Sequence, residues 1–126
     1  MDKIYKIKVF NDTIDKFFDY LIETFPLYKS DVSLSRSSIE LIRRGNPRLV
    51  IQQFIEYIEP YANKILNCDE EFFLNFDNYT DIPKEHMMYG LKLKGIWKSS
   101  NISNSQKAVI WLYFHKLYRL GKDIIS

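Results

Sequence analysis

"SNSQKAVIWLYFHKLYRLGKDI", residues 103–124, is the stretch that decides the fold. Its apolar side chains recur at every third or fourth position, which is the spacing of one face of an α-helix. That face consists of Ile110, Phe114, Leu117, Gly121 and Ile124. Ser103, followed by Gln106 three positions later, is a capping-box pattern that marks where the helix begins. The stretch therefore predicts a long helix with one buried side.

Helical spacing continues through most of the chain that precedes this stretch. Further helices are predicted over residues 10–25, 31–44, 47–59, 69–76 and 84–98. Asn46 before Pro47 is a start signal for a helix. Pro60 must break a helix, because proline lacks a backbone N–H and clashes with the preceding turn. The sequence predicts an all-α, compact single domain of five to six helices, with its helical core over residues 11–126.

The first ten residues have a different pattern. In "KIYKIKVF", residues 3–10, Tyr5, Ile7 and Val9 alternate with Lys6 and Lys8. Alternation of apolar and polar residues is typical of an extended segment. No second strand is predicted that could pair with it. We therefore expect an extended N-terminal arm over residues 1–10 that lies on the helices or contacts a second copy.

The composition is that of a soluble globular protein. The chain has 126 residues, of which 46% are hydrophobic and 16% aromatic, so it can bury a core without a disulfide framework. Its one cysteine, Cys68, fits a reducing compartment. The first residues hold no signal-peptide run, and no window approaches the roughly 20 apolar residues of a membrane span. We expect a protein that is neither secreted nor transmembrane.

Charge is divided unevenly along the chain. The net charge is +2, but residues 1–83 carry −4 and residues 84–126 carry +6. One interpretation is two complementary surfaces within one domain. The other is a basic face for nucleic acid or an acidic partner. The first interpretation is slightly favoured.

"NCDEEFFLNFDNYTD", residues 67–81, clusters five carboxylates but does not match a calcium loop. Such a loop needs Gly at position 6 and Glu at position 12. The register that starts at Asp77 and the one that starts at Asp69 both fail. Asn67 and Glu70 instead fit a helix N-terminus, where carboxylates are favoured. We predict no metal site here; a cation, if any binds, would lie between Asp77 and Asp81.

No sequence motif indicates catalysis. His86 and His115 lie 29 residues apart, and neither has zinc-site spacing to Cys68. No glycine-rich phosphate loop and no G-x-S-x-G element is present. An enzyme would require these two histidines or the cysteine to converge with carboxylates in a pocket. We therefore expect no catalytic residue, no cofactor and no small-molecule substrate.

One row of residues on the last predicted helix is a candidate binding site. The row consists of Lys107, Trp111, His115, Arg119 and Lys122. At 100° per residue these side chains fall within about a third of the helix circumference. Cations with an indole among them could contact phosphates and stack a base. The alternative, which we favour, is that Trp111 belongs to the core and the charges form its solvated border.

Four segments together resemble a known group of proteins. They are "FFDYLIETFP", "NPRLVIQQFIEYIEPY", "DEEFFL" and "IWLYFHKL", in that order. This pattern, from about Val9 to Leu120, resembles small uncharacterised helical proteins encoded by large and giant cytoplasmic DNA viruses of algae and other protists. The resemblance rests on apolar anchors and implies a helical domain located in the host cytoplasm or the virion. It implies no activity and no site residues.

The leading hypothesis is a non-enzymatic viral interaction or virion-associated protein that acts through its surface. It expects a protein partner or self-association, and no membrane. The alternative is a nucleic-acid-binding accessory protein that uses the row from Lys107 to Lys122.

Overall fold

A computed structural model describes residues 2–76, 86–87, 91–99 and 101–126, and helices account for most of them. The α-helices are α1 (Lys3–Thr24), α2 (Lys29–Gly45), α3 (Pro47–Ile58), α4 (Ala62–Leu66), α5 (Glu71–Leu74), α6 (Leu93–Trp97) and α7 (Asn104–Ile125). Two 3₁₀-helices, η1 (Pro26–Tyr28) and η2 (Glu59–Tyr61), join α1 to α2 and α3 to α4. No strand occurs in the described residues. The predicted all-α class is confirmed.

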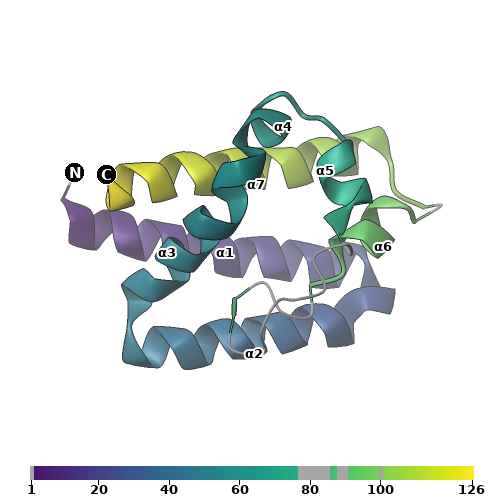
Figure 1. The fold of residues 1–126 in the computed structure, drawn as a ribbon. Coiled ribbons are helices and arrows are strands. Elements are labelled where there is room, and N and C mark those ends of the chain that lie inside the picture. Colours follow the sequence, from purple (N-terminus) through teal and green to yellow (C-terminus); the bar gives the residue numbers. More distant parts are fainter. Residues whose placement is uncertain (1, 77–85, 88–90, 100) are drawn as a thin grey trace.

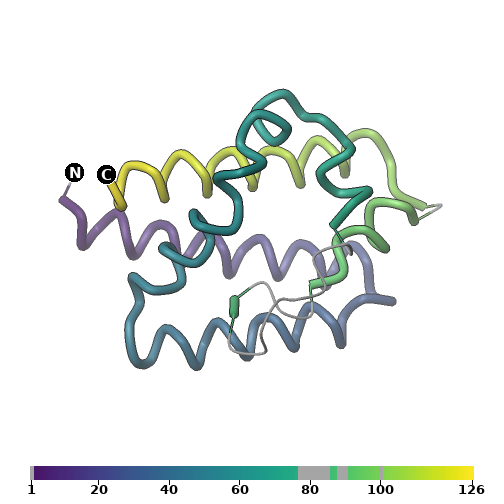
Figure 2. The backbone as a smooth tube through the Cα atoms, in the orientation of Figure 1, coloured from purple at the N-terminus to yellow at the C-terminus, as the bar shows by residue number. Residues whose placement is uncertain are grey.

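The two longest helices come from opposite ends of the chain and pack against each other. α1 and α7 run antiparallel, so the N- and C-termini lie at the same end of the molecule (Figure 1). α2 returns along α1, and α3 crosses from α2 to contact both α1 and α7. The tube in Figure 2 shows the chain continuing from α3 to α4, which lies beside α7. The termini of the chain therefore build one side of the fold together.

The core is dominated by aromatic rings that meet around Phe114 of α7. The Phe114 ring centroid lies 5.6 Å from that of Phe17 and 6.2 Å from that of Phe54. Phe72 and Phe73 of α5 approach it at 5.8 Å and 5.3 Å. All five side chains are at most 2% exposed. Rings from α1, α3, α5 and α7 thus share one cluster, and such pairs stabilise a core beyond the area they bury.

The predicted helix boundaries in the middle and at the end of the chain are confirmed. The Asn46 side chain accepts a hydrogen bond from the Arg48 N–H at 3.1 Å, and Pro47 is the first residue of α3. Ser103 and Gln106 form both hydrogen bonds of the capping box. At Pro60 the α-helical pattern gives way to η2. These signals are local, which is why the sequence alone could place them.

The prediction of an extended arm over residues 1–10 is wrong. Residues 3–10 are the first part of α1, and the Asp2 side chain caps them by accepting a hydrogen bond from the Tyr5 N–H at 2.8 Å. Ile7 and Phe10 face the core, whereas Tyr5 is 53% exposed. An eight-residue window fits a period of two and a period of 3.6 about equally well. Packing against α7 decides between them, and Lys6 contributes an ion pair to Asp123 there.

Two predictions around the acidic stretch also need correction. Asn67 does not cap the helix that follows; Asp69 instead accepts a hydrogen bond from the Glu71 N–H at 3.0 Å. The predicted helix over residues 84–98 is helical over Leu93–Trp97, and parts of the range lie outside the described residues. The suggested cation position between Asp77 and Asp81 lies outside them as well.

Gly121 lets α7 approach α3 closely. A Cβ atom at this position would lie 2.6 Å from Cδ1 and 2.8 Å from Cγ1 of Ile55. Real Cβ atoms do not approach other heavy atoms so closely, so a larger residue must displace Ile55. The predicted apolar face of the last helix is confirmed, and its glycine is the point where the two helices meet.

Candidate interaction surface

Trp111, the aromatic member of the predicted row, belongs to the core. Its side chain is 8% exposed. Its ring centroid lies 4.6 Å from that of Phe73 and 5.4 Å from that of Trp97. Phe73 and Trp97 in turn stack at 4.4 Å. A ring packed on these neighbours presents no free face to a base, so the core interpretation of Trp111 is confirmed.

Lys107, at the start of the row, forms an ion pair with a carboxylate of the acidic stretch. Its Nζ lies 2.9 Å from Oε1 of Glu70 and 5.1 Å from the centroid of the Trp97 ring. The Trp97 indole N–H donates to the same carboxylate oxygen at 3.2 Å. The hydrogen bond from Lys107 holds the pKa of Glu70 below its usual value. A carboxylate that seemed available for a ligand thus joins the acidic stretch to α7.

Lys122, at the other end of the row, is also paired. Its Nζ lies 3.0 Å from Oε1 of Glu59, and the Tyr118 hydroxyl donates to Oε2 of Glu59 at 2.9 Å. The hydrogen bonds from Lys122 and Tyr118 lower the pKa of Glu59. Together with the Lys107 pair, this contact joins basic residues near the C-terminus to acidic residues earlier in the chain. Part of the uneven charge is therefore compensated within the fold.

His115 meets Cys68, although their sequence spacing gave no sign of it. His115 Nε2 lies 2.6 Å from the Ile65 carbonyl oxygen and 3.8 Å from Cys68 Sγ. Cys68 has a left-handed backbone with φ of 52°, and the Asp69 N–H donates to the Lys64 carbonyl at 2.8 Å, an arrangement that ends α4. A carbonyl oxygen can only accept, so Nε2 carries a hydrogen and is not free to take the thiol proton. The hydrogen bond from His115 to the Ile65 carbonyl therefore joins the end of α4 to α7. The geometry does not match a cysteine nucleophile activated by a histidine base.

His86 lies elsewhere. Its ring packs against Tyr57 of α3, with centroids 5.8 Å apart, and burial lowers the pKa of His86. The structure thus places His115 beside Cys68 and His86 against Tyr57. No group of three or more His, Cys, Asp or Glu side chains suited to a metal ion occurs in the part of the chain that the structure describes.

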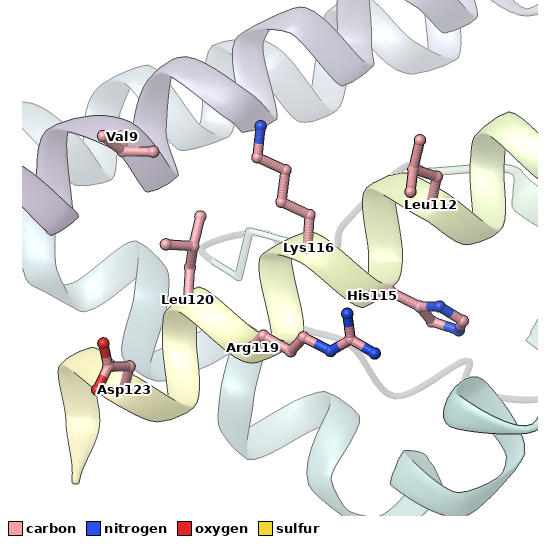
Figure 3. A pocket seen from close by; sticks show the side chains of 7 residues that line it. All are labelled: Val9, Leu112, His115, Lys116, Arg119, Leu120 and Asp123. Carbon is pink, nitrogen blue, oxygen red and sulfur yellow. The ribbon is translucent and has the colours of Figure 1, made fainter.

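Arg119, unlike Lys107 and Lys122, forms no ion pair with a described residue, and it lies at a groove. The groove, of about 530 Å³, is lined by Val9 of α1 and by a set of α7 residues drawn in Figure 3. Lys116 points from α7 toward α1, while Arg119 and His115 extend on the other side of the helix (Figure 3). A continuation of about 180 Å³ shares Leu112 and Lys116 with it and adds Lys16 of α1. The larger hollow extends from Val9 of α1 over the exposed side of α7 to Arg119, and the smaller one lies between α1 and α7.

We define the α1–α7 groove by six side chains of two kinds. The apolar ones are Val9, Leu112 and Leu120, and the basic ones are Lys16, Lys116 and Arg119. Leu112 is 66% exposed. None of the three basic residues forms an ion pair with a described residue. The groove thus combines exposed apolar surface with positive charge that forms no ion pair among the described residues.

Of these six residues, the sequence predicted only Arg119 as part of a site. The three other groove residues on α7 are Leu112, Lys116 and Leu120. Their spacing at intervals of four was the available signal, because it places two leucines off the buried face of the helix. Val9 and Lys16 lie about a hundred residues earlier, so their place in the groove depends on the packing of α1 against α7. The contribution of α1 to the groove could therefore not be predicted from the pattern of α7 alone.

A search for relatives gives no further guide to the groove. None of the described helices has an apolar stretch of the length that a membrane span requires. No protein-family model, no curated protein sequence and no solved structure matches the chain.

Proposed function

We propose that the protein is a non-enzymatic interaction protein that binds a protein partner through the α1–α7 groove. The observation that carries the proposal is the exposure of Leu112 among Lys16, Lys116 and Arg119. Most other basic side chains near α7 have acceptors: Lys107, for example, pairs with Glu70. Exposed apolar surface bordered by charge is typical of a protein–protein contact.

The resemblance to viral proteins extends this proposal to a place of action. On that basis we propose that the partner is a component of the virus particle or of the infected cell's cytoplasm. Mass spectrometry of purified particles tests the first possibility. A protein that stays monomeric and is absent from particles would count against virion association.

Site-specific photo-crosslinking tests the groove itself. A photoreactive amino acid replaces Leu112 in one variant and Leu41 of α2 in the control, because these two leucines are 66% and 67% exposed. In infected cells, we expect a discrete adduct at Leu112 and none at Leu41. Equal adducts at both positions would indicate general stickiness, and no adduct at Leu112 would contradict the proposal.

Nucleic-acid binding is the second candidate, and it is favoured by Lys16, Lys116 and Arg119, which form no ion pair with a described residue. Burial of Trp111 and the pairing of Lys107 and Lys122 remove most of the predicted row from this role. If nucleic acid binds, binding must weaken with salt and with Arg119→Ala. Titration of a labelled single-stranded or duplex oligonucleotide at low salt measures this, and absence of binding there would eliminate the candidate.

A further inference from the structure

We infer that the occupant of the α1–α7 groove is an acidic amphipathic helix of about three turns. This inference rests on the proposed function, because it names the chemistry of the partner at the same surface. Its three grounds are the shape of the groove, its apolar side chains and its positive charge.

The shape of the groove fits a helix. It runs along α7 beside the antiparallel α1, and the α7 residues that line it run from Leu112 to Asp123. At 1.5 Å per residue this stretch is about 17 Å long, which is the length of about three helical turns. A helix satisfies its own backbone hydrogen bonds, so it can lie on leucine side chains without leaving N–H and C=O groups unpaired. An extended segment would have no sheet edge to pair with among the described residues.

The apolar side chains require an apolar stripe on the partner. Leu112 and Leu120 are separated by two turns of α7, with Val9 of α1 beside them. Such a spacing is matched by partner side chains at intervals of three and four, which form one face of a helix. Phosphate groups could pair with the cations but would leave Leu112 in contact with water. For this reason the groove favours a peptide over nucleic acid.

The charge of the groove requires carboxylates on the partner. Lys116 lies between the two leucines in Figure 3, Arg119 lines the same hollow, and Lys16 lines its continuation. Among the described residues that line the groove, the acidic one, Asp123, is already paired with Lys6. A partner with Asp or Glu beside its apolar stripe would meet three cations that form no ion pair with a described residue; of the three, Lys16 interacts with Asp12 at longer range. Charge complementarity of this kind sets specificity and speeds association.

A displayed library of helix-favouring peptides of about fifteen residues tests the inference. Peptides are selected on the whole protein, with counter-selection on the Leu112→Ser, Lys116→Glu, Arg119→Glu variant. We expect groove-dependent binders to be amphipathic and rich in Asp and Glu on the flanks of the apolar stripe. Groove-dependent binders that are basic or not amphipathic, or the absence of groove-dependent binders, would overturn the inference.

The affinity of one selected peptide then separates groove binding from general attraction. We expect Lys116→Glu with Arg119→Glu to weaken binding about tenfold or more, since each reversal replaces an exposed ion pair by a repulsion. The control is Arg44→Glu with Arg48→Glu, which changes net charge equally at two exposed residues outside the groove. Equal weakening by both pairs would overturn the inference, because net charge alone would then explain the binding.

Leu112→Ala tests the apolar contact. It should weaken the peptide about tenfold through lost burial, whereas Leu41→Ala on α2 should leave affinity unchanged. A labelled oligonucleotide that binds the groove more tightly than any selected peptide would also overturn the inference. If photo-crosslinks form at Leu112 but no acidic helix is selected, the proposed interaction stands and only the acidic helix fails.

Discussion

Trp111→Ala separates the two roles that the sequence left open for this residue. As a core residue, the indole contacts Phe73 and Trp97 and is 8% exposed. Removing a buried tryptophan side chain costs about 3–5 kcal/mol through lost burial and the cavity that remains. A domain of this size is stable by about 5–15 kcal/mol, so the loss is a large fraction of the total. An exposed stacking residue would instead change stability by less than about 0.5 kcal/mol.

Urea unfolding followed by far-UV circular dichroism measures this loss. With a urea dependence of about 2 kcal/mol per molar, the midpoint should fall by about 2 M. Trp111→Phe, which keeps most of the ring contacts, should cost less than half as much and guards against complete unfolding of the alanine variant. Arg119→Ala is the matched surface control on α7 and should leave the midpoint nearly unchanged. A Trp111→Ala midpoint equal to that of the wild-type protein would refute the core role.

Three other substitutions test the packing, capping and ion pairs of the fold. Gly121→Ala should destabilise the protein by about 1 kcal/mol, because overpacking against Ile55 exceeds the gain in helix propensity. Ile55→Val should relieve part of that cost, which a double-mutant cycle measured by urea unfolding would show. Asp2→Ala should remove about 1 kcal/mol of local stability and speed amide hydrogen exchange in the first turns of α1, but not in α3. Glu59→Gln should lower the free energy of unfolding near neutral pH, where Glu59 is ionised and paired with Lys122. The pKa of Glu59 in the folded protein lies below its ordinary 4.5, so the carboxylate stabilises the fold only while it is ionised. The difference between variant and wild-type protein should therefore disappear as the pH falls through that lowered pKa. Because this ion pair is largely solvated, its whole effect should stay under about 1 kcal/mol; a difference between variant and wild-type urea midpoints that grows toward acid pH would contradict the assignment.

Most of the helices could be predicted because their signals are local. The apolar face of residues 103–124, the capping box at Ser103 and the proline at position 47 each act within one or two turns. The prediction for the first ten residues was wrong because their structure is decided by a distant contact. Their short pattern fits both a strand and a helix, and the choice is made by α7, about a hundred residues later in the chain.

The candidate site was harder to predict because the ion-pair partners of its basic residues are set by tertiary packing and lie far away in the sequence. Lys107 and Lys122 lie on one side of α7 with Arg119, as a helical wheel indicates. Their acceptors, Glu70 and Glu59, lie 37 and 63 residues away in the sequence. No pattern on α7 shows which of its cations will be compensated. In the structure, Lys107 and Lys122 join α7 to the rest of the fold, whereas Lys116 and Arg119 form no ion pair with a described residue.

A charge swap between the groove and its partner tests the central claim most directly. The selected acidic peptide and a copy with its Asp and Glu residues replaced by Lys are each titrated against the wild-type protein and against the Lys116→Glu, Arg119→Glu variant. If the α1–α7 groove binds an acidic helix, the wild-type protein prefers the acidic peptide and the variant prefers the basic one, with affinity recovered to within about threefold. A variant that binds neither peptide, or one that still prefers the acidic peptide, would contradict the claim.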